Sequence, residues 1–510
     1  MTFEEAPTLD RTPTLTSISK DTFLYLPGRI VPAVMAFATT VLLTKRMLSP
    51  ADFGRYDLTM RLVLFLTVAT VIWLSVVLLR FYPRYAPKEE GGLGGDPSAF
   101  NAVVALLRWI GIGVGLTGLV LVWAFGPEDF FGSYRSLLGM AAIVFVGNSL
   151  MELGLATARA RGQPRAYSVA AGLNALLRLP FGILIFWVSA TGVAGFLCGF
   201  GLVPIIVSIL LMRRDLVHPV SFRLTFEQKA FLKECLLYGM PILVTLILNF
   251  FLGNTDRFLL KYFQGDAMVG AYAAATGLLE QPMTMLFQTL MIAVFPAITA
   301  LYETKGREAT QDLLRELTRQ FLLFCLPLCV MLSVLSRPIM FALTKKDYWD
   351  VYVVAPWLVT ASFMYGLSYY ATFGLHLSKK TGVLLAVTVI SIAVNLGVNM
   401  VAIPRYGYIG CGIAKLTANT VLVGVVALAS RRHLHWPFPW KSLLRIGFAS
   451  SAAGAMVFLL QRHLTPNLLN LVILSCSFGI AYVIMSLVAR EVRLNDLLGL
   501  IQSRAKPGGR

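Results

Sequence analysis

The sequence predicts an all-α polytopic membrane protein with about 14 transmembrane helices. Hydrophobic residues make up 57% of the 510 residues and charged residues only 14%, whereas a soluble domain carries roughly 25% charged residues. The hydrophobic residues form separate stretches of about 20 residues, the length that an α-helix needs to cross the hydrocarbon core. A transmembrane β-barrel would instead show alternating segments of about 10 residues.

The expected spans follow one another with short connections. They cover residues 22–44, 58–80, 100–125, 136–159, 166–190, 193–213, 235–262, 269–300, 317–342, 351–376, 381–403, 408–430, 442–462 and 468–489. The seventh and eighth are long and contain polar residues, so we expect them to bend or to extend beyond the bilayer. Residues 1–21 lack the basic start of a signal peptide, so we expect the first span to be retained.

The net charge of +18 comes from Lys and Arg residues that lie mainly between the hydrophobic stretches. This placement indicates membrane topology rather than binding of nucleic acid. Most of these residues lie in the even-numbered connections and the two tails. Because the more basic side of a membrane protein stays in the cytoplasm, we expect both termini to be cytoplasmic.

The second half of the sequence repeats the first at an offset of about 216 residues. Gly54, in the motif GRY after the first span, corresponds to Gly270, in the motif GAY after the seventh. Pro83 at the end of the second span corresponds to Pro296 at the end of the eighth. Six spans separate the copies, so both have the same orientation, and an axis along the membrane normal should relate them around a cavity.

The repeat divides the chain into four expected parts. These are an N-terminal six-helix bundle (1–215), a cytoplasmic linker (216–234), a C-terminal six-helix bundle (235–432), and two extra transmembrane helices with a cytoplasmic tail (433–510). The linker has room for one short amphipathic helix at the membrane surface. The extra helices could form a groove for a lipid tail or support the bundles.

Four motifs carry a family resemblance: LSPADFGRYDL at 48–58, LRFYPRY at 79–85, ARARGQPRAYS at 158–168 and NTDRFLLKYFQGDAMVGAYAAATGLL at 254–279. With them, the chain resembles the polysaccharide transporter family of the multidrug/oligosaccharidyl-lipid/polysaccharide exporter superfamily. The resemblance implies two six-helix bundles around a central cavity in a bacterial inner membrane. It also implies a flippase that moves a polyprenyl-pyrophosphate-linked oligosaccharide to the outer leaflet. Membrane lipids and polysaccharide assembly proteins are its expected partners.

Basic residues inside spans are the candidates for binding such a substrate. Each costs about 2.5–3.5 kcal/mol at a helix centre, so it should face a cavity or a partner. Arg29, Arg178 and Lys415 are the candidates, because the guanidinium and ammonium groups match the charge of a pyrophosphate. For Arg178 the alternative is a structural pair with a carboxylate such as Glu152 or Glu280. For Arg29 the alternative is contact with lipid headgroups.

Amides and carboxylates inside spans are secondary candidates. Sugar hydroxyls could bind Asn174, Asn249, Gln288, Asn395 and Asn399. The alternative for each amide is a hydrogen bond between helices. Glu280 and Asp256 are the candidates for coupling transport to an ion, although an internal pair of Asp256 with Arg257 is the favoured interpretation. Arg61 and Arg108 lie near span ends and should reach the membrane surface.

No sequence motif indicates an enzyme, a cofactor or a metal site. Two alternatives to a sugar-lipid flippase remain from the sequence. One is a cation-coupled multidrug exporter of the same superfamily, which would favour an acidic cavity. The other is a non-transporting membrane subunit of a polysaccharide export complex, which would depend on its partners for activity.

The topology leads to a labelling prediction. A membrane-impermeant thiol reagent applied from outside should label cysteines introduced at positions 131 and 346 but not at 163, 222 or 379, because the first two positions lie in odd-numbered connections. Labelling in intact cells, compared with labelling after permeabilisation, measures this. Outside labelling at position 222 would contradict the even number of spans between the repeats.

Overall fold

The computed structural model describes residues 27–85, 97–216 and 224–491, and every regular element in these ranges is helical. Thirteen helical segments there are long and apolar enough to cross a membrane. One of them, Asp266–Val334, is 69 residues long and contains the eighth expected span and most of the ninth. The fold is therefore the predicted all-α membrane architecture with about 14 spans.

The chain forms two compact units. The first comprises residues 27–36 and 62–246, the second residues 37–61 and 247–491. The first unit contains α4 (Trp73–Tyr85), α5 (Pro97–Phe125), α6 (Glu128–Phe131), α7 (Arg135–Ala160), α8 (Pro164–Ser189) and α9 (Val193–Leu216). The second contains α11 (Asp266–Ala275), α12 (Gln281–Val334), α13 (Ser336–Leu343), α14 (Ala355–Leu377), α15 (Thr381–Tyr406), α16 (Tyr408–Ser430), α17 (Trp440–Leu460) and α18 (Leu468–Val488).

Three helices pass from one unit to the other: α2 (Pro27–Leu42), α3 (Pro50–Thr67) and α10 (Phe226–Gln264). The boundaries of the compact units therefore differ from those of the expected bundles. Residues 37–61 belong to the second unit, and residues 224–246 belong to the first. The expected linker also differs, since its residues 226–234 are the first turns of α10 rather than a separate helix. The division of the chain into two sequence repeats stays a prediction.

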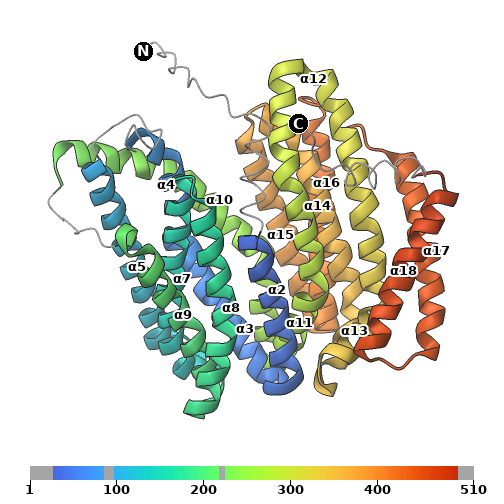
Figure 1. The fold of residues 1–510 in the computed structure, drawn as a ribbon, viewed down its shortest axis with the longest axis horizontal. Helices are drawn as coiled ribbons and strands as arrows, with labels where there is room; N and C mark the ends of the chain where they lie inside the picture. Colours follow the sequence, from blue (N-terminus) through green and yellow to red (C-terminus); the bar gives the residue numbers. More distant parts are fainter. Residues whose placement is uncertain (1–26, 86–96, 217–223, 492–510) are drawn as a thin grey trace, which may run out of the picture. The chain divides into compact units, whose positions relative to one another are not determined.

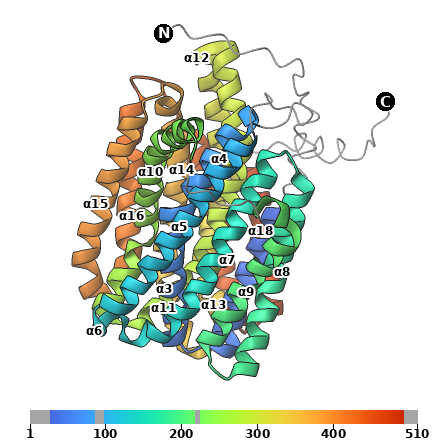
Figure 2. The same ribbon diagram turned by 90° about the vertical axis from the view of Figure 1, so that its left-hand side faces the viewer.

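In the first unit, α7 packs against both α8 and α9 (Figure 2). The helices α7 and α9 approach closely at Gly147, where a Cβ atom would lie 2.5 Å from the backbone oxygen of Gly201. A second contact region is aromatic: the rings of Phe81 and Phe100 both pack against Phe231 of α10, with centroids 5.6 and 5.9 Å away. Small residues and packed aromatic rings together hold these helices, as is usual where lipid supplies no hydrophobic driving force between them.

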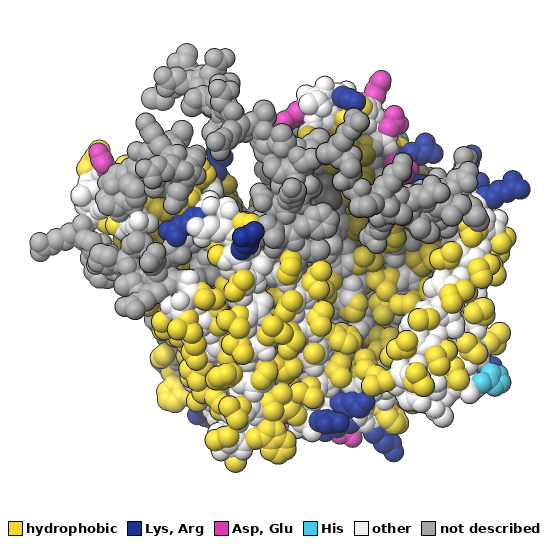
Figure 3. Space-filling view, viewed as in Figure 1, with side chains coloured by type: hydrophobic (Ala, Val, Ile, Leu, Met, Phe, Trp, Pro, Cys, Tyr) yellow, Lys and Arg dark blue, Asp and Glu magenta, His cyan; other side chains and the backbone are white. Residues whose placement is uncertain are grey.

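In the second unit, α14 packs against α12 and α16, and α15 packs against α16 (Figure 1). The helix α12 changes direction at Gly306, whose φ of 77° is accessible mainly to glycine. This bend separates the eighth and ninth spans. The helices α17 and α18 form a hairpin that packs against α12. Figure 3 shows hydrophobic side chains along the exposed face of this hairpin, as expected of a surface that meets lipid.

The helices α3 and α11 cross at the two glycines that the sequence repeat aligns. A Cβ atom on Gly54 would lie 2.0 Å from the backbone oxygen of Asp266, and one on Gly270 would lie 1.8 Å from the backbone oxygen of Pro50. Both distances are far below any van der Waals contact, so neither position admits a side chain without separating the helices. The two repeat-related motifs thus meet each other in space.

The crossing predicts a stability difference between glycine positions. Gly54→Ala and Gly270→Ala should each destabilise the protein by roughly 1–3 kcal/mol or more, because the added methyl group overlaps rigid backbone. Gly253→Ala is the matched control, since a Cβ atom there meets nothing within 4 Å. Thermal unfolding of the purified protein in detergent measures the effect. Equal unfolding temperatures for Gly54→Ala and Gly253→Ala would contradict the described crossing.

Candidate functional site

The centre of the candidate site is a buried ion pair between Asp57 of α3 and Arg257 of α10. The Arg257 Nε atom lies 2.9 Å from Asp57 Oδ2, and the two side chains are only 5% and 11% exposed. The N–H group is not aimed at that oxygen, so the contact is an ion pair rather than a hydrogen bond. In an apolar environment each charge alone would be costly, so each depends on the other.

Arg257 also holds the start of the eighth span. Its Nη2 atom donates a hydrogen bond to Thr276 Oγ1 at 2.8 Å, and its guanidinium carbon lies 5.5 Å from the centre of the Tyr272 ring. The expected pair with Asp256 is present, with 3.6 Å between Arg257 Nη1 and Asp256 Oδ1. The Tyr272 hydroxyl donates a hydrogen bond to the other oxygen of Asp256. The Arg257 side chain therefore contacts groups from three segments.

A second ion pair joins two of the predicted site residues, Glu280 and Lys415. The Nζ atom of Lys415 on α16 lies 2.7 Å from Glu280 Oε1, and the Ser362 hydroxyl of α14 donates to the same oxygen at 3.0 Å. The Lys415 and Glu280 side chains are 12% and 13% exposed. Glu280 ends the π-helical turn Thr276–Glu280, which begins at the residue that Arg257 binds. The two ion pairs are therefore linked through one turn of helix.

We name these six residues the charged cluster: Asp57, Arg61, Asp256, Arg257, Glu280 and Lys415. It contains three carboxylates and three basic groups, so its formal charge is zero. A bound anion would have to draw a basic group away from its carboxylate partner. A bound cation would have to draw a carboxylate away from its basic partner. Among the described residues, no group of three or more His, Cys, Asp and Glu side chains could hold a metal ion.

The sequence did not single out Asp57. It lies near the expected start of the second span, where a carboxylate can usually reach water. The sequence therefore did not reveal that this carboxylate is buried. Its position four residues before Arg61 was a usable signal, because such residues face each other on a helix. Arg61 Nη2 does donate to Asp57 Oδ1 at 3.1 Å. The Arg61 side chain is also 31% exposed, so the expectation that it reaches the membrane surface stays a prediction.

Arg178 lies in the first unit and connects three helices. Its Nη2 atom donates to Asn148 of α7, and its Nε atom donates to the backbone oxygen of Phe200 of α9 at 3.2 Å. The Phe200 ring also lies 4.3 Å from the guanidinium carbon. The two suggested carboxylate partners form ion pairs with other residues, Glu152 with Arg159 and Glu280 with Lys415. A substrate-binding role for Arg178 stays a prediction.

Three other polar residues of the first unit differ in exposure. Arg29 is exposed near the start of α2, so it is open to either a substrate or lipid headgroups. Asn174 is half-buried, and its Oδ1 atom has no hydrogen-bond partner among the described residues. Arg108 is 3% exposed, and its guanidinium carbon lies 5.5 Å from the Trp109 ring centre. The expectation that Arg108 reaches the membrane surface is wrong, because its side chain packs inside the unit.

The candidate amides of the second unit fall into two groups. Asn395 and Asn399 are buried on α15, and Asn399 Nδ2 donates to Asn395 Oδ1 at 2.9 Å. This bond lies within one helix, whereas the alternative interpretation placed such bonds between helices. Asn249 of α10 and Gln288 of α12 are exposed. The exposed pair is therefore the one that can offer hydrogen bonds to a ligand.

Comparisons with known proteins bear on this arrangement. The model of a family described as polysaccharide biosynthesis protein matches residues 18–302. The lipid II flippase MurJ in its inward closed conformation shares 16% sequence identity; the match covers 91% of this chain and 98% of that one, with a TM-score of 0.72. An inward-facing multidrug resistance MATE family transporter of the MOP superfamily shares 14% sequence identity. The match covers 80% of this chain and 97% of that one, with a TM-score of 0.64. No curated protein matches the sequence significantly.

A third solved structure, a MATE transporter of Vibrio cholerae, shares 16% identity over 81% of this chain and 95% of that one, with a TM-score of 0.54. At such low identities these likenesses concern the fold and not the substrate.

The charged cluster predicts a stability cycle. Arg257→Gln should destabilise the protein by about 3–5 kcal/mol, because it leaves the buried Asp256 without a counter-charge and Asp57 with Arg61 alone. The double variant Asp57→Asn/Arg257→Gln should lose less stability than the two single variants Asp57→Asn and Arg257→Gln lose together. Arg84→Gln is the control, since Arg84 forms an exposed ion pair with Glu234 and should have little effect. Thermal unfolding in detergent measures all four variants. Strictly additive losses would show that Asp57 and Arg257 are not coupled.

Proposed function

The chain belongs to the polysaccharide biosynthesis protein family, and from this premise we propose that it flips a polyprenyl-pyrophosphate-linked oligosaccharide from the cytoplasmic to the outer leaflet of a bacterial inner membrane. The family description supports a role in polysaccharide synthesis. The fold shared with a lipid II flippase supports lipid transport. Transport would occur by alternating access, and the oligosaccharide is the part that must be kept out of the hydrocarbon.

The ion pair between Lys415 and Glu280 is the observation that carries the proposed mechanism. A pyrophosphate diester carries about two negative charges, so it needs basic groups along its path. Arg257 is buried, and it contacts two carboxylates. Lys415 has a single carboxylate partner and a side chain that is 12% exposed. Of these two basic groups, Lys415 is therefore the one that an anion can recruit more readily.

Glu280 would then couple transport to an ion. A proton or a metal cation on Glu280 would weaken its hold on Lys415, and the freed ammonium group would bind the pyrophosphate. Loss of the phosphate would let the pair re-form and release the ion. Asp256 is a weaker candidate for this role, because Arg257 and Tyr272 both hold its carboxylate.

The remaining predicted residues would assist. Arg29 and Arg178 would supply positive charge, and the exposed amides of Asn249 and Gln288 would bind sugar hydroxyls. A multidrug exporter of the same superfamily is the second candidate, supported by the likeness to MATE transporters. A cationic drug requires a carboxylate without a basic partner, whereas each carboxylate of the charged cluster has one.

A transport assay tests the proposal. Proteoliposomes would contain a fluorescent polyprenyl-pyrophosphate oligosaccharide, and quenching from one side would follow its movement. Lys415→Gln should reduce the rate about tenfold or more, because the pyrophosphate loses a charged contact. Glu280→Gln should retain substrate binding but lose the response to an imposed pH or sodium gradient. Lys261→Gln is the matched control, because Lys261 forms a similarly buried pair with Asp266 outside the charged cluster.

Two outcomes would oppose the proposal. Normal flipping by Lys415→Gln would remove this residue from the substrate path. Efflux of a cationic dye that depends on Glu280, with no movement of the sugar lipid, would instead establish the multidrug exporter.

A further inference from the structure

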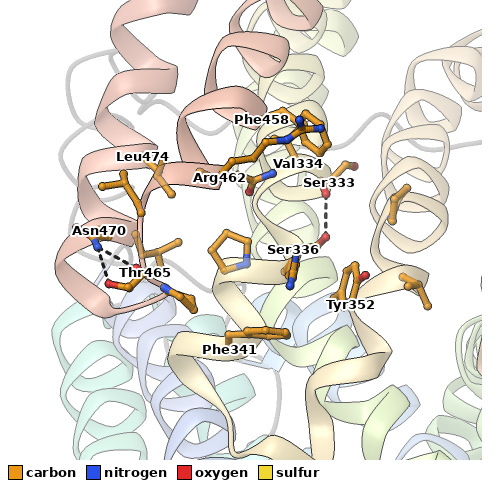
Figure 4. A pocket seen from close by; sticks show the side chains of 18 residues that line it. Ser333, Val334, Ser336, Phe341, Tyr352, Phe458, Arg462, Thr465, Asn470 and Leu474 are labelled. Carbon is orange, nitrogen blue, oxygen red and sulfur yellow. Dashed lines mark hydrogen bonds between the residues drawn. The ribbon is translucent and has the colours of Figure 1, made fainter.

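A pocket of about 830 Å³ lies in the second unit, between the α17–α18 hairpin and the neighbouring ends of α12, α13 and α14 (Figure 4). None of its lining residues belongs to the charged cluster. The connections on which it is built join the ninth to the tenth span and the thirteenth to the fourteenth. Both are odd-numbered connections, so the topology predicted from the sequence puts the pocket at the outer surface of the membrane.

Two arginines line this pocket from different segments. Arg337 lies at the start of α13, and its guanidinium carbon is 5.2 Å from the centre of the Phe341 ring. Arg462 follows α17, and its guanidinium carbon is 5.0 Å from the centre of the Phe458 ring. Figure 4 shows Arg462 beside Phe458, with Phe341 on another side of the pocket. The ring contacts orient each guanidinium group and leave its N–H donors available.

Neither arginine has a carboxylate within ion-pair distance among the described residues, in contrast to the basic groups of the charged cluster. Two positive charges on one pocket repel each other unless an anion lies with them. A phosphate is the anion that guanidinium groups bind best, because its oxygens accept two parallel hydrogen bonds. The pocket therefore has the charge of a phosphate site.

Neutral groups of the pocket add to this preference. The helix α18 begins at its edge, with Asn467 Oδ1 accepting a hydrogen bond from the Asn470 backbone N–H at 2.8 Å. The positive end of this 21-residue helix favours an anion beside it. Gln461, which follows α17, also lines the pocket.

Most of the remaining lining is apolar, including Val334, Leu471 and Leu474. Beyond the pocket, the first turns of α18 expose further hydrophobic side chains, with Leu469 70% and Val472 59% exposed. A free phosphate ion would use none of this surface. An amphiphile with a phosphate headgroup would use the polar and the apolar parts together.

We propose that this pocket binds the headgroup of an anionic membrane phospholipid, with its phosphate between Arg337 and Arg462 and its acyl chains along the exposed side of α18. The bound lipid would fasten the α17–α18 hairpin to α13 and α14 by neutralising both arginines. This site is independent of the proposed flipping of a sugar lipid, because it shares no residue with the charged cluster.

Binding of defined lipids to the delipidated, purified full-length protein tests this site. Phosphatidylglycerol should raise the unfolding temperature and remain bound in native mass spectrometry, whereas phosphatidylcholine and inorganic phosphate should have little effect. Arg337→Gln and Arg462→Gln should each weaken phosphatidylglycerol binding about tenfold, equivalent to about 1.4 kcal/mol. Arg135→Gln is the control, because it removes one exposed positive charge from another odd-numbered connection.

The double lysine variant Arg337→Lys/Arg462→Lys keeps the charge but loses the paired N–H donors, so it should bind more tightly than the double glutamine variant and thereby separate lost binding from lost folding. Wild-type affinity in the double glutamine variant would overturn the proposal. Equal stabilisation by inorganic phosphate would assign the pocket to a free anion, and equal binding of phosphatidylcholine would show that charge does not select the ligand. Either result would overturn the anionic lipid site.

Discussion

The ion pair between Asp57 and Arg257 depends on a backbone crossing that only glycine permits. Gly54 and Gly270 bring α3 and α11 together so closely that each lacks room for a Cβ atom. Asp57 lies on α3 one turn beyond Gly54, where the carboxylate meets Arg257 of α10. Arg257 in turn binds Thr276, from which the π-helical turn leads to Glu280 and its partner Lys415. Much of the polar interior of the second unit therefore follows from one close contact between two helices.

Charge balance explains why such a cluster can be both stable and responsive. Three carboxylates and three basic groups offset one another, so the apolar interior holds no net charge. The same balance makes the cluster sensitive to any added charge, because a proton, an ion or a phosphate must displace an existing partner. The partners are unequal in number: Arg257 has several and Lys415 has one carboxylate. Of these two, Lys415 should therefore be displaced first, and the Arg257 end should preserve the structure.

The basic groups of the pocket beside the α17–α18 hairpin differ from those of the charged cluster. Arg337 and Arg462 contact aromatic rings rather than carboxylates, so their positive charge is not offset by an ion pair among the described residues. Such an arrangement is acceptable where water and lipid headgroups are near, and it would be costly in the interior. The two sites thus differ in the way their environments compensate positive charge. In the cluster the protein supplies the counter-charge, and at the pocket the membrane would supply it.

The sequence by itself determined the membrane class, the spans and the residues that carry charge inside them, because hydrophobicity and span length act locally along the chain. It also aligned Gly54 with Gly270, and the pair of Asp256 with Arg257 was expected from adjacency. Only the tertiary structure decided which distant charges meet. Position along a span gives the depth of a side chain but not the neighbouring helix that it faces, so Lys415 with Glu280 and Asp57 with Arg257 could not be paired beforehand. Arg108 was misjudged for the same reason, because its side chain packs inside the protein rather than at the membrane surface.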